Sequence, residues 1–398
     1  MATLKDIVQA DGLFCDGDWI EKKDQNPNGS VRLIQLADIG DGIFKDKSSK
    51  FVTDDTAERL HCTFLEKGDI LIARLPDPLG RACIFPLSGK YITAVDVAIL
   101  RIHNPKIDSR FVMHMINSHM FRSQIANYES GTTRKRISRR NLEKIQFNLP
   151  SIDEQKLTAS YVDKLFSELD KGVETLQTIK EQLTVYRQAV LKAAFSSHYN
   201  KKPIRDISSM VTSGSRGWAK YYNENGARFI RITDLTRDSI KLKSNSIQRV
   251  LLPETAEGKR SRLQGNDVLI SITADLGSIA LIPQNIEEAY INQHIAVVRF
   301  SNVHQGEFMA WYLKSDYGQK DLLKNKRGGG KLGLGLDDIR NTPVPIVTDE
   351  DADRVVEEIE SRLSVCDSIE QTVDIALAQA EVMRQSILKK AFEGELCK

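Results

Sequence analysis

Short hydrophobic runs recur through residues 1–150 and again through residues 199–347. They are rich in β-branched and aliphatic residues and are bounded by Gly, Pro, Asn or Asp, which favours strands. Examples are GDILIAR (68–74), AILRI (98–102), RFIRI (228–232) and DVLISI (267–272). Residues 111–129 and 308–325 instead have the three- and four-residue spacing of apolar positions that is typical of helices. Each stretch is therefore expected to fold as a globular domain of mixed strands and helices.

A longer periodic pattern follows each of these stretches, and it starts at the capping-box sequences SIDE (151–154) and TDED (348–351). One row of apolar residues recurs every seven positions: Val162, Leu169, Leu176, Leu183 and Val190, and again Ile359, Cys366, Val373, Ala380 and Ile387. A second row is expected three positions later, at Leu165, Ile179, Tyr186 and Ala193, and at Ile369, Ala376 and Met383. Such rows are typical of a coiled coil. The alternative is two ordinary amphipathic helices on separate cores.

The chain also repeats itself at an offset of about 197 residues. YRQAVLKAAF (186–195) matches MRQSILKKAF (383–392), and RLIQLADI (32–39) matches RFIRITDL (228–235). Further matches keep the same order along the chain, so one unit of about 199 residues is used twice. Two such units can pair about a pseudo-twofold axis, which would make the long helices antiparallel.

The sequence therefore predicts an α+β fold with a pseudo-twofold internal repeat. Two similar mixed α/β domains are separated by two long helices that form an antiparallel coiled coil. The expected boundaries are 1–150 for the first domain, 151–198 for a central spacer helix, 199–347 for the second domain and 348–398 for a distal spacer helix.

Charge is distributed unevenly along the 398 residues, although the net charge is only +2. Residues 349–381 carry eleven acids and two bases, so the rest of the chain is strongly basic. A basic bulk suggests a polyanionic partner, although a solvated acidic helix and scattered surface lysines would give the same totals. No apolar run approaches the ~20 residues of a membrane span, and the N-terminus has no signal-like segment. Five scattered cysteines without C-x-x-C favour a reducing cytoplasm and argue against structural zinc.

Basic loops occupy matching positions in the two repeats. GTTRKRISRRNL (131–142) carries Arg134, Lys135, Arg136, Arg139 and Arg140, and KNKRGGGKLGLG (324–335) carries Lys326, Arg327 and Lys331. Arginine and lysine contact DNA phosphates, and arginine can also fork onto guanine edges. A solvated basic loop is the simpler explanation for either one, but the matched placement favours DNA binding.

Two further clusters are candidate DNA contacts. TSGSRGWAKYY (212–222) interleaves Arg216, Trp218 and Lys220, which suits backbone contact with stacking, or equally aromatics in a core. Arg74 and Arg81 flank the turn RLPDPLGR (74–81), which could project into a groove, and one of these two arginines could be structural.

Catalytic motifs are missing. GGGKLG has Leu332 where a Walker loop needs Ser or Thr, and GLGLDD does not complete G-x-G-x-x-G. The histidines form no H-E-x-x-H, and the Asn/Asp-Pro-Pro-aromatic motif of DNA amino-methyltransferases is absent. No catalytic residue and no metal ligand are therefore predicted.

Taken together, these motifs resemble the specificity subunit of type I restriction-modification enzymes, the HsdS family. The resemblance extends from DGDWIEKKDQNPNGSVRLIQLADIGDG, GDILIAR and SGTTRKRIS through SGSRGWAKYY and RFIRITDL to the two repeated helix ends. It implies that the domains are target-recognition domains, each reading one half of a bipartite, asymmetric site in double-stranded DNA. It also implies that the helices set the gap and dock two methyltransferase subunits, with restriction/translocase subunits as further partners.

By the same resemblance, the chain is a cytoplasmic, non-catalytic subunit without a membrane partner. S-adenosylmethionine, ATP and magnesium are expected on the partner subunits. Base-contacting residues do not carry over from the family, because target-recognition domains vary with their targets. Two other classes stay open: a coiled-coil adaptor whose heads bind non-DNA ligands, and an enzyme with an unrecognised site, which strongly perturbed carboxylates in a cleft would favour.

Overall fold

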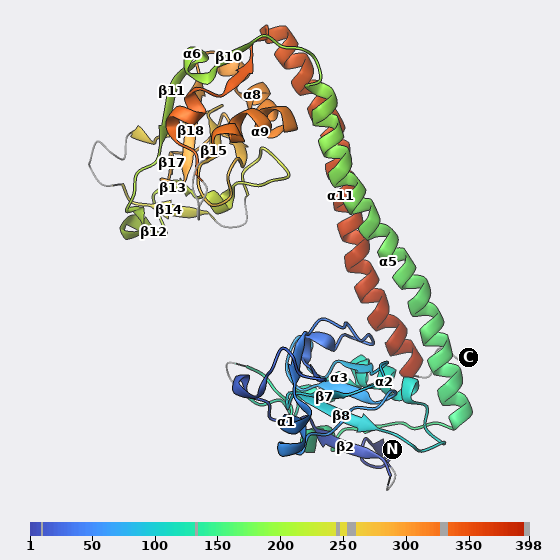
Figure 1. Ribbon diagram of the computed structural model, residues 1–398. Helices are drawn as coiled ribbons and strands as arrows, with labels where there is room; N and C mark the ends of the chain where they lie inside the picture. The colour runs from blue at the N-terminus through green and yellow to red at the C-terminus, as the bar shows by residue number, and fades with distance from the viewer. Residues whose placement is uncertain (9–10, 132–133, 244–246, 253–259, 327–332, 394–398) are drawn as a thin grey trace. The chain divides into compact units, whose positions relative to one another are not determined.

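The computed structural model describes residues 1–8, 11–131, 134–243, 247–252, 260–326 and 333–393 (Figure 1). Two compact units make up the chain: Met1–Leu176 with Ile375–Lys398, and Gln177–Asp374. The first is unit 1 and the second is unit 2. Each unit contains one globular domain and a part of each of the two long helices.

In unit 1, the domain is built on two sheets. An antiparallel sheet has the order β2-β8-β5-β6, and a smaller sheet has the order β4-β3-β7 with β3 parallel to β7. The strands are β2 (Leu13–Asp16), β3 (Val31–Ile34), β4 (Lys50–Val52), β5 (Ile70–Ala73), β6 (Ala82–Ile84), β7 (Tyr91–Thr93) and β8 (Val97–Arg101). Because β5 is buried on both faces, it reads as the continuous apolar run ILIA rather than as an alternating one.

Short helices and a two-stranded ribbon complete this domain. Helices α2 (Ser109–Asn117) and α3 (His119–Ala126) pack against the four-stranded sheet through Phe111, Ile116 and Phe121. Asp108 and Ser118 cap the two helix starts by accepting hydrogen bonds from backbone N–H groups. The remaining elements are β1 (Ala2–Thr3) paired with β9 (Gln146–Phe147), α1 (Asp54–Arg59), α4 (Arg139–Leu142), η1 (Lys22–Asp24) and η2 (Leu36–Asp38).

The domain of unit 2 repeats the domain of unit 1 almost element by element. Its sheets have the orders β11-β18-β15-β16 and β12-β14-β13-β17, again with one parallel pair, β13 and β17. The strands are β10 (Lys201–Pro203), β11 (Ser208–Ser213), β12 (Tyr222–Asn223), β13 (Ala227–Ile230), β14 (Gln248–Val250), β15 (Val268–Ser271), β16 (Ile279–Leu281), β17 (Ala289–Ile291), β18 (Ile295–Phe300) and β19 (Pro343–Pro345). The helices are α6 (Ile204–Ile207), η3 (Trp218–Tyr221), η4 (Ile232–Asp234), η5 (Val303–Gln305), α8 (Gly306–Lys314), α9 (Asp316–Leu322), η6 (Leu323–Asn325) and α10 (Leu336–Arg340).

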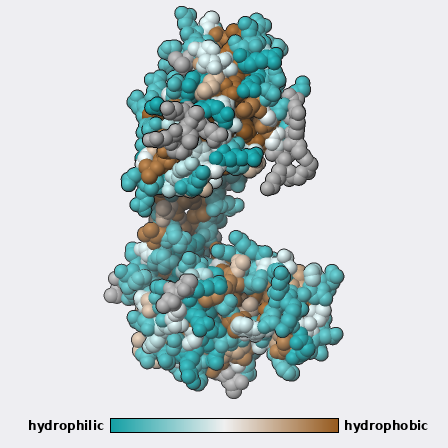
Figure 2. All heavy atoms as spheres, turned by 90° about the vertical axis from the view of Figure 1, so that its left-hand side faces the viewer, coloured by the Kyte–Doolittle hydropathy of each residue, from teal (hydrophilic) through white to brown (hydrophobic). Residues whose placement is uncertain are grey.

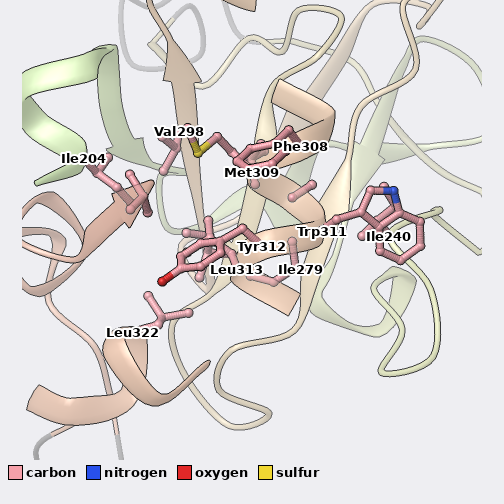
Figure 3. Packing of buried hydrophobic residues seen from close by; sticks show 14 of the residues in the cluster. Ile204, Ile240, Ile279, Val298, Phe308, Met309, Trp311, Tyr312, Leu313 and Leu322 are labelled. Atoms are coloured by element: carbon pink, nitrogen blue, oxygen red, sulfur yellow. The ribbon is translucent and has the colours of Figure 1, made fainter. Parts of the chain in front are cut away.

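The core of unit 2 forms where α8 packs on the sheet of β11, β18, β15 and β16 (Figure 3). Phe308, Met309 and Tyr312 of α8 lie among Val298 and the other buried side chains of the cluster. Trp311 points the other way from α8 and lies against Ile240. The helix is therefore buried on nearly all sides, which explains its almost unbroken apolar sequence.

The same buried arginine–aspartate pair occurs at corresponding positions of both domains and confirms the repeat. Arg101 Nε lies 2.8 Å from Asp69 Oδ1, and Arg299 Nη2 lies 2.7 Å from Asp267 Oδ2. Both carboxylates are fully buried and also accept hydrogen bonds from the backbone N–H three residues earlier. Removing one partner of such a pair would leave a buried charge uncompensated, so these pairs belong to the framework of the fold.

Two long helices, α5 (Ile152–Ala194) and α11 (Asp349–Phe392), start where the capping boxes predict. Ser151 Oγ accepts from the Glu154 backbone N–H at 3.4 Å, and the Glu154 carboxylate accepts from the Ser151 backbone N–H at 2.9 Å. In the second helix Thr348 Oγ1 accepts from the Asp351 backbone N–H.

The two helices pair in antiparallel orientation within each unit. In unit 1 Arg384 forms an ion pair with Asp170. In unit 2 Lys180 Nζ lies 2.7 Å from Asp374 Oδ1, and Arg187 Nη1 lies 2.7 Å from Asp367 Oδ1. Partner numbers on α11 fall as those on α5 rise, which confirms the expected antiparallel coiled coil.

The seam of the coiled coil differs from the prediction in one of its two rows. The row that contains Val162 and Leu183 is buried or half-buried, as is the row from Ile359 to Ile387. The expected second row is wrong at several positions, because Tyr186 is 46%, Ile369 41% and Met383 53% exposed. The actual second row lies one residue further on and consists of Phe166, Val173, Lys180, Arg187 and Ala194, and of Leu363, Glu370, Leu377 and Arg384. Arg187 also pairs with Glu370 of this row, at 2.9 Å. Hydrophobicity could not identify the row, because its polar members are half-buried in ion pairs between the helices.

Candidate nucleic-acid interface

The basic loop of unit 1 presents several cations to solvent. A two-way backbone pairing of Ser130 with Arg136, at 2.9 and 2.8 Å, closes the loop, and residues 132–133 lie outside the described residues. Arg134, Arg136 and Arg140 are exposed. Lys135 is exposed as well, but its Nζ lies 2.5 Å from Glu129 Oε1, which neutralises part of its charge. The loop therefore offers three arginines for contact with an anionic partner.

The other predicted arginine of this loop anchors it. Arg139 starts α4 behind the cap Ser138, and its guanidinium lies over the Phe14 ring at 5.8 Å. It also pairs with Glu143 and lies 3.8 Å from Asp16. Arg139 is thus held against the end of β2 rather than projecting freely into solvent.

Arg74 joins three segments at the same corner. Its Nη1 donates to Asp16 Oδ1 at 2.6 Å and to the Val95 carbonyl at 2.9 Å, and its Nε donates to the Ile137 carbonyl at 3.0 Å. The end of β5 is thereby tied to the end of β2 and to the basic loop. Contact of Arg74 with DNA stays a prediction, and the structure assigns this side chain to loop positioning.

Of the two arginines that flank the turn, Arg81 is clearly structural. Its side chain is only 7% exposed, and its guanidinium donates to the carbonyls of Leu36, Ile39, Leu75 and Pro78 at 2.7–3.1 Å. Burial lowers the pKa of the Arg81 guanidinium. These bonds hold the turn at residues 75–78. If the turn projects into a DNA groove, Arg81 therefore supports it from the protein side and does not contact the DNA.

In unit 2 the predicted cluster divides into exposed and buried members. Arg216 and Lys220 are exposed, and Lys220 Nζ lies 4.9 Å from the centre of the Tyr221 ring. Trp218 is 5% exposed and packs on Phe229 at 5.1 Å. The core alternative is therefore correct for Trp218, which follows Gly217 in the left-handed conformation at φ +80. Lys326 is exposed after η6, whereas Arg327 and Lys331 lie outside the described residues.

A polar hollow of about 710 Å³ surrounds Arg216. Its walls come from the segment after β11, the end of β15 and the β17–β18 turn, and they include Arg260, Gln293 and His294. His294 Nδ1 lies 2.6 Å from Thr273 Oγ1, and its Nε2 lies 2.9 Å from the Gln293 side-chain nitrogen. The sequence did not identify Arg260, Gln293 or His294 as candidates. For Gln293 and His294, the available signal was the polar run NQH at 292–294, directly after a buried strand.

The same corner differs in chemistry between the units. Arg74, Asp16 and Arg139 of unit 1 correspond in the repeat to Ile272, Ser213 and Leu336 of unit 2. One corner is thus crossed by ion pairs, and the other is a polar hollow lined by Arg216 and Arg260 and by no acidic residue. The backbone framework is shared, while the groups that a ligand would meet are different.

Two general properties of the described chain bear on this interface. The visible surface in Figure 2 is mostly hydrophilic over both domains, and hydrophobic residues form scattered groups. Within the described ranges, no three His, Cys, Asp or Glu residues are placed to hold a metal ion. No helix in those ranges is long and apolar enough to cross a membrane.

The chain contains two copies of one mixed sheet-and-helix domain, and the polar corners of the copies differ. An antiparallel helix pair joins them. This arrangement defines a class of recognition proteins with two different binding domains. The chain belongs to the family of the Type I restriction modification DNA specificity domain, whose model matches residues 1–184 and 198–378. This match covers both repeats and most of each long helix.

Individual relatives agree with the family assignment. The chain is 27% identical over 330 residues to the type I restriction enzyme EcoBI specificity subunit of Escherichia coli, and the match covers 75% of this chain and 68% of the relative. It is 25% identical over 309 residues to the StySPI specificity subunit of Salmonella potsdam, and the match covers 73% of this chain and 66% of the relative. These relatives give no support to the adaptor alternative.

Solved structures share the fold over nearly the whole chain. A structure described as the basis of complex assembly and conformational transition of the type I R-M system matches with a TM-score of 0.72 at 16% identity, covering 98% of this chain and 99% of the other. The HsdS subunit from Thermoanaerobacter tengcongensis matches with a TM-score of 0.52 at 17% identity, covering 98% of each.

Proposed function

We propose that this chain is the sequence-reading subunit of a type I restriction-modification complex, with each globular domain reading one half of a bipartite site in double-stranded DNA. The observation that carries the proposal is the contrast between the corners of the two units, which share a framework but present different side chains. Two different readers on one scaffold suit an asymmetric target.

The exposed cations are the proposed DNA contacts. In unit 1 these are Arg134, Arg136 and Arg140, and in unit 2 they are Arg216, Lys220, Arg260 and Lys326. Exposed arginines and lysines suit phosphates, and arginines within the hollow of unit 2 suit base edges. Arg74, Arg81 and Arg139 act beneath them as positioning residues, since their donors are engaged by backbone carbonyls and carboxylates. Arg327 and Lys331 are proposed on sequence alone.

The long helices are proposed to set the gap between the half-sites and to dock two methyltransferase subunits, with restriction/translocase subunits as further partners. Catalysis is assigned to those partners, which would also bind S-adenosylmethionine, ATP and magnesium. Support for partner subunits comes from membership of the family and from the fold shared with the type I R-M assembly described above. A cytoplasmic location follows from this role.

Methylation mapping tests the proposal. Cells that express the chain with its methyltransferase partner should show methylation at one bipartite motif. Cells that express the partner without the chain should not. Exchange of residues 1–150 for the corresponding domain of a relative should change one half of the motif and preserve the other. If both halves change, or if methylation is independent of the chain, the two-reader proposal is wrong.

A further inference from the structure

The turn between β17 and β18 is a fixed wall of the polar hollow in unit 2. The Asn292 side-chain oxygen accepts a hydrogen bond from the His294 backbone N–H at 3.1 Å, and the His294 carbonyl accepts from the Ile272 N–H at 3.0 Å. On the other side of the turn, Gly214 approaches so closely that a Cβ there would collide with the Asn292 carbonyl oxygen. The backbone that carries Gln293 and His294 is therefore held from two sides.

A chain of two hydrogen bonds fixes the side chains of this turn. His294 Nε2 lies 2.9 Å from Gln293 Nε2, and His294 Nδ1 lies 2.6 Å from Thr273 Oγ1. An amide nitrogen donates hydrogen bonds and does not accept them, so His294 Nε2 is the acceptor. The imidazole proton is then on Nδ1 and is donated to Thr273. The histidine thereby holds the Gln293 amide in one of its two orientations.

The Gln293 amide keeps one N–H and its oxygen Oε1 for a ligand in the hollow. Among the described residues, no protein group forms a hydrogen bond with either of them. A donor beside an acceptor matches the major-groove edge of adenine, where N7 accepts and the 6-amino group donates. Guanine presents two acceptors at that edge, N7 and O6, so the amide oxygen would face another acceptor. The orientation of the amide therefore favours adenine.

The charge around the hollow suits DNA as the ligand. Arg216 and Arg260 line the hollow of about 710 Å³, and both are exposed. Within the described part of the chain, neither guanidinium lies within 4.0 Å of a carboxylate oxygen, and no acidic residue lines the hollow. Two guanidinium groups without a countercharge attract a polyanion, which would bring base edges to the wall that carries Gln293.

Unit 1 has a different wall at this place. Its corresponding turn carries Val95 and Asp96 at the positions of Gln293 and His294. The amide and the imidazole that orients it therefore belong to unit 2 alone. A residue that differs between two copies of one framework is suited to reading a different base in each half-site.

We propose that Gln293 reads an adenine in the half-site of unit 2, and that His294 and Thr273 are positioning residues that fix its amide. A bidentate contact of this kind uses both remaining groups of the amide. The inference rests on the proposed function and names the base that one residue recognises.

The first test measures the His294 imidazole in the full chain without DNA. Long-range ¹⁵N–¹H correlation spectra distinguish a proton on Nδ1 from one on Nε2, and His294→Asn identifies the signals among the seven histidines. The proton should be on Nδ1. A proton on Nε2 would require the Gln293 oxygen to accept it, which would leave only N–H groups for the DNA and would overturn the proposal.

The second test uses the complex with the methyltransferase partner and duplexes that carry the motif found by methylation mapping. The domain exchange described above identifies the half read by unit 2. In that half, single adenines that are not themselves methylated are replaced by 7-deazaadenine, which lacks N7, or by purine, which lacks the 6-amino group. At one position each analogue should weaken binding to the wild type about tenfold.

Variants then connect this position to Gln293. Gln293→Ala should bind the natural duplex about tenfold more weakly and should show no further loss on either analogue. His294→Leu should reduce the loss caused by the analogues at the same position, which a general weakening of the fold would not do. Gln284→Ala, at an exposed amide outside the hollow, should keep the wild-type pattern.

The proposal is wrong if the half-site of unit 2 has no such adenine, or if every analogue weakens Gln293→Ala as much as the wild type. Failure of the proposed function would look different. In that case methylation mapping would give no bipartite motif with the wild-type chain, whereas the proton on His294 would still be found on Nδ1.

Discussion

The ring of Phe392, at the end of α11, lies 5.2 Å from the ring of Phe111 on α2. In the other unit Phe195, at the end of α5, lies 5.4 Å from Phe308 on α8. Each repeated helix end thus closes onto the domain of its own unit. The arginine eight residues earlier, Arg384 or Arg187, pairs with an acid of the opposite helix. These contacts explain why YRQAVLKAAF and MRQSILKKAF share their arginine, leucine and phenylalanine positions.

Truncation of these aromatic side chains should destabilise each unit separately. Phe195→Ala should lower the unfolding free energy of unit 2 by about 3–5 kcal/mol, because the side chain is only 2% exposed. Phe392→Ala should cost unit 1 less, since Phe392 is half-buried. Urea unfolding followed by hydrogen exchange distinguishes the units. Tyr186→Ala, at a position that is 46% exposed, serves as the control and should change little.

Arg81 should prove to be a stability residue. Arg81→Met removes donors from the carbonyls of Leu36, Ile39, Leu75 and Pro78, and should cost about 1–3 kcal/mol. The salt dependence of DNA binding should stay at the wild-type slope in the folded variant. Thermal unfolding and fluorescence anisotropy measure the two effects, and a flatter salt slope would instead show that Arg81 contacts phosphate.

The exposed loop of unit 1 should behave in the opposite way. Each phosphate contact contributes about 0.9 to the slope of log affinity against log salt. Replacing Arg134, Lys135 and Arg136 by alanine should flatten the slope by about two and leave the unfolding midpoint unchanged, because these side chains are exposed. Lys156→Ala on the exposed face of α5 is the matched control. An unchanged slope would identify the loop as solvated surface.

Glu307 should make the stability of unit 2 depend on pH in a defined direction. Its pKa is 4.5 in the reference state and about 7 in the folded chain, so the folded state binds more protons between these values. Its contribution to stability is therefore lost as pH rises from about 4.5 to 7. Glu307→Gln should raise the melting temperature relative to wild type by about 2 °C at pH 8 and by less at pH 5. Glu357→Gln should show no such difference, and equal effects of Glu307→Gln at both pH values would contradict the assignment.

Lengthening α5 should change the gap between the half-sites. Four residues inserted near Gln177 add about 6 Å of helix, and a coiled coil accommodates four extra residues by local unwinding. Since one base pair adds ~3.4 Å, the variant should methylate a motif whose gap is one or two base pairs longer, with both half-sequences unchanged. Pairing with α11 opposes a full shift and favours one base pair. A folded, active variant with the original gap would rule out the helix as a spacer.

The sequence by itself determined the repeat, the two mixed domains and the helix pair. Matching runs such as GDILIAR and DVLISI lie at corresponding strands, β5 and β15, because buried central strands need apolar residues on both faces. Capping boxes located both helix starts, since the first N–H groups of a helix need a partner wherever the helix lies. These signals are local or periodic and need no knowledge of neighbours.

Only the tertiary structure decided which polar side chains are exposed and what they meet. Arg81 and Arg136 look alike in the sequence, yet four carbonyls surround the first and solvent surrounds the second. The second seam row of the coiled coil depends on half-buried ion pairs, such as Arg187 with Asp367, that hydrophobicity cannot report. Glu307 and Glu360 lie 53 positions apart in the sequence and come near each other only because α11 passes α8, so the raised pKa of Glu307 is a consequence of packing.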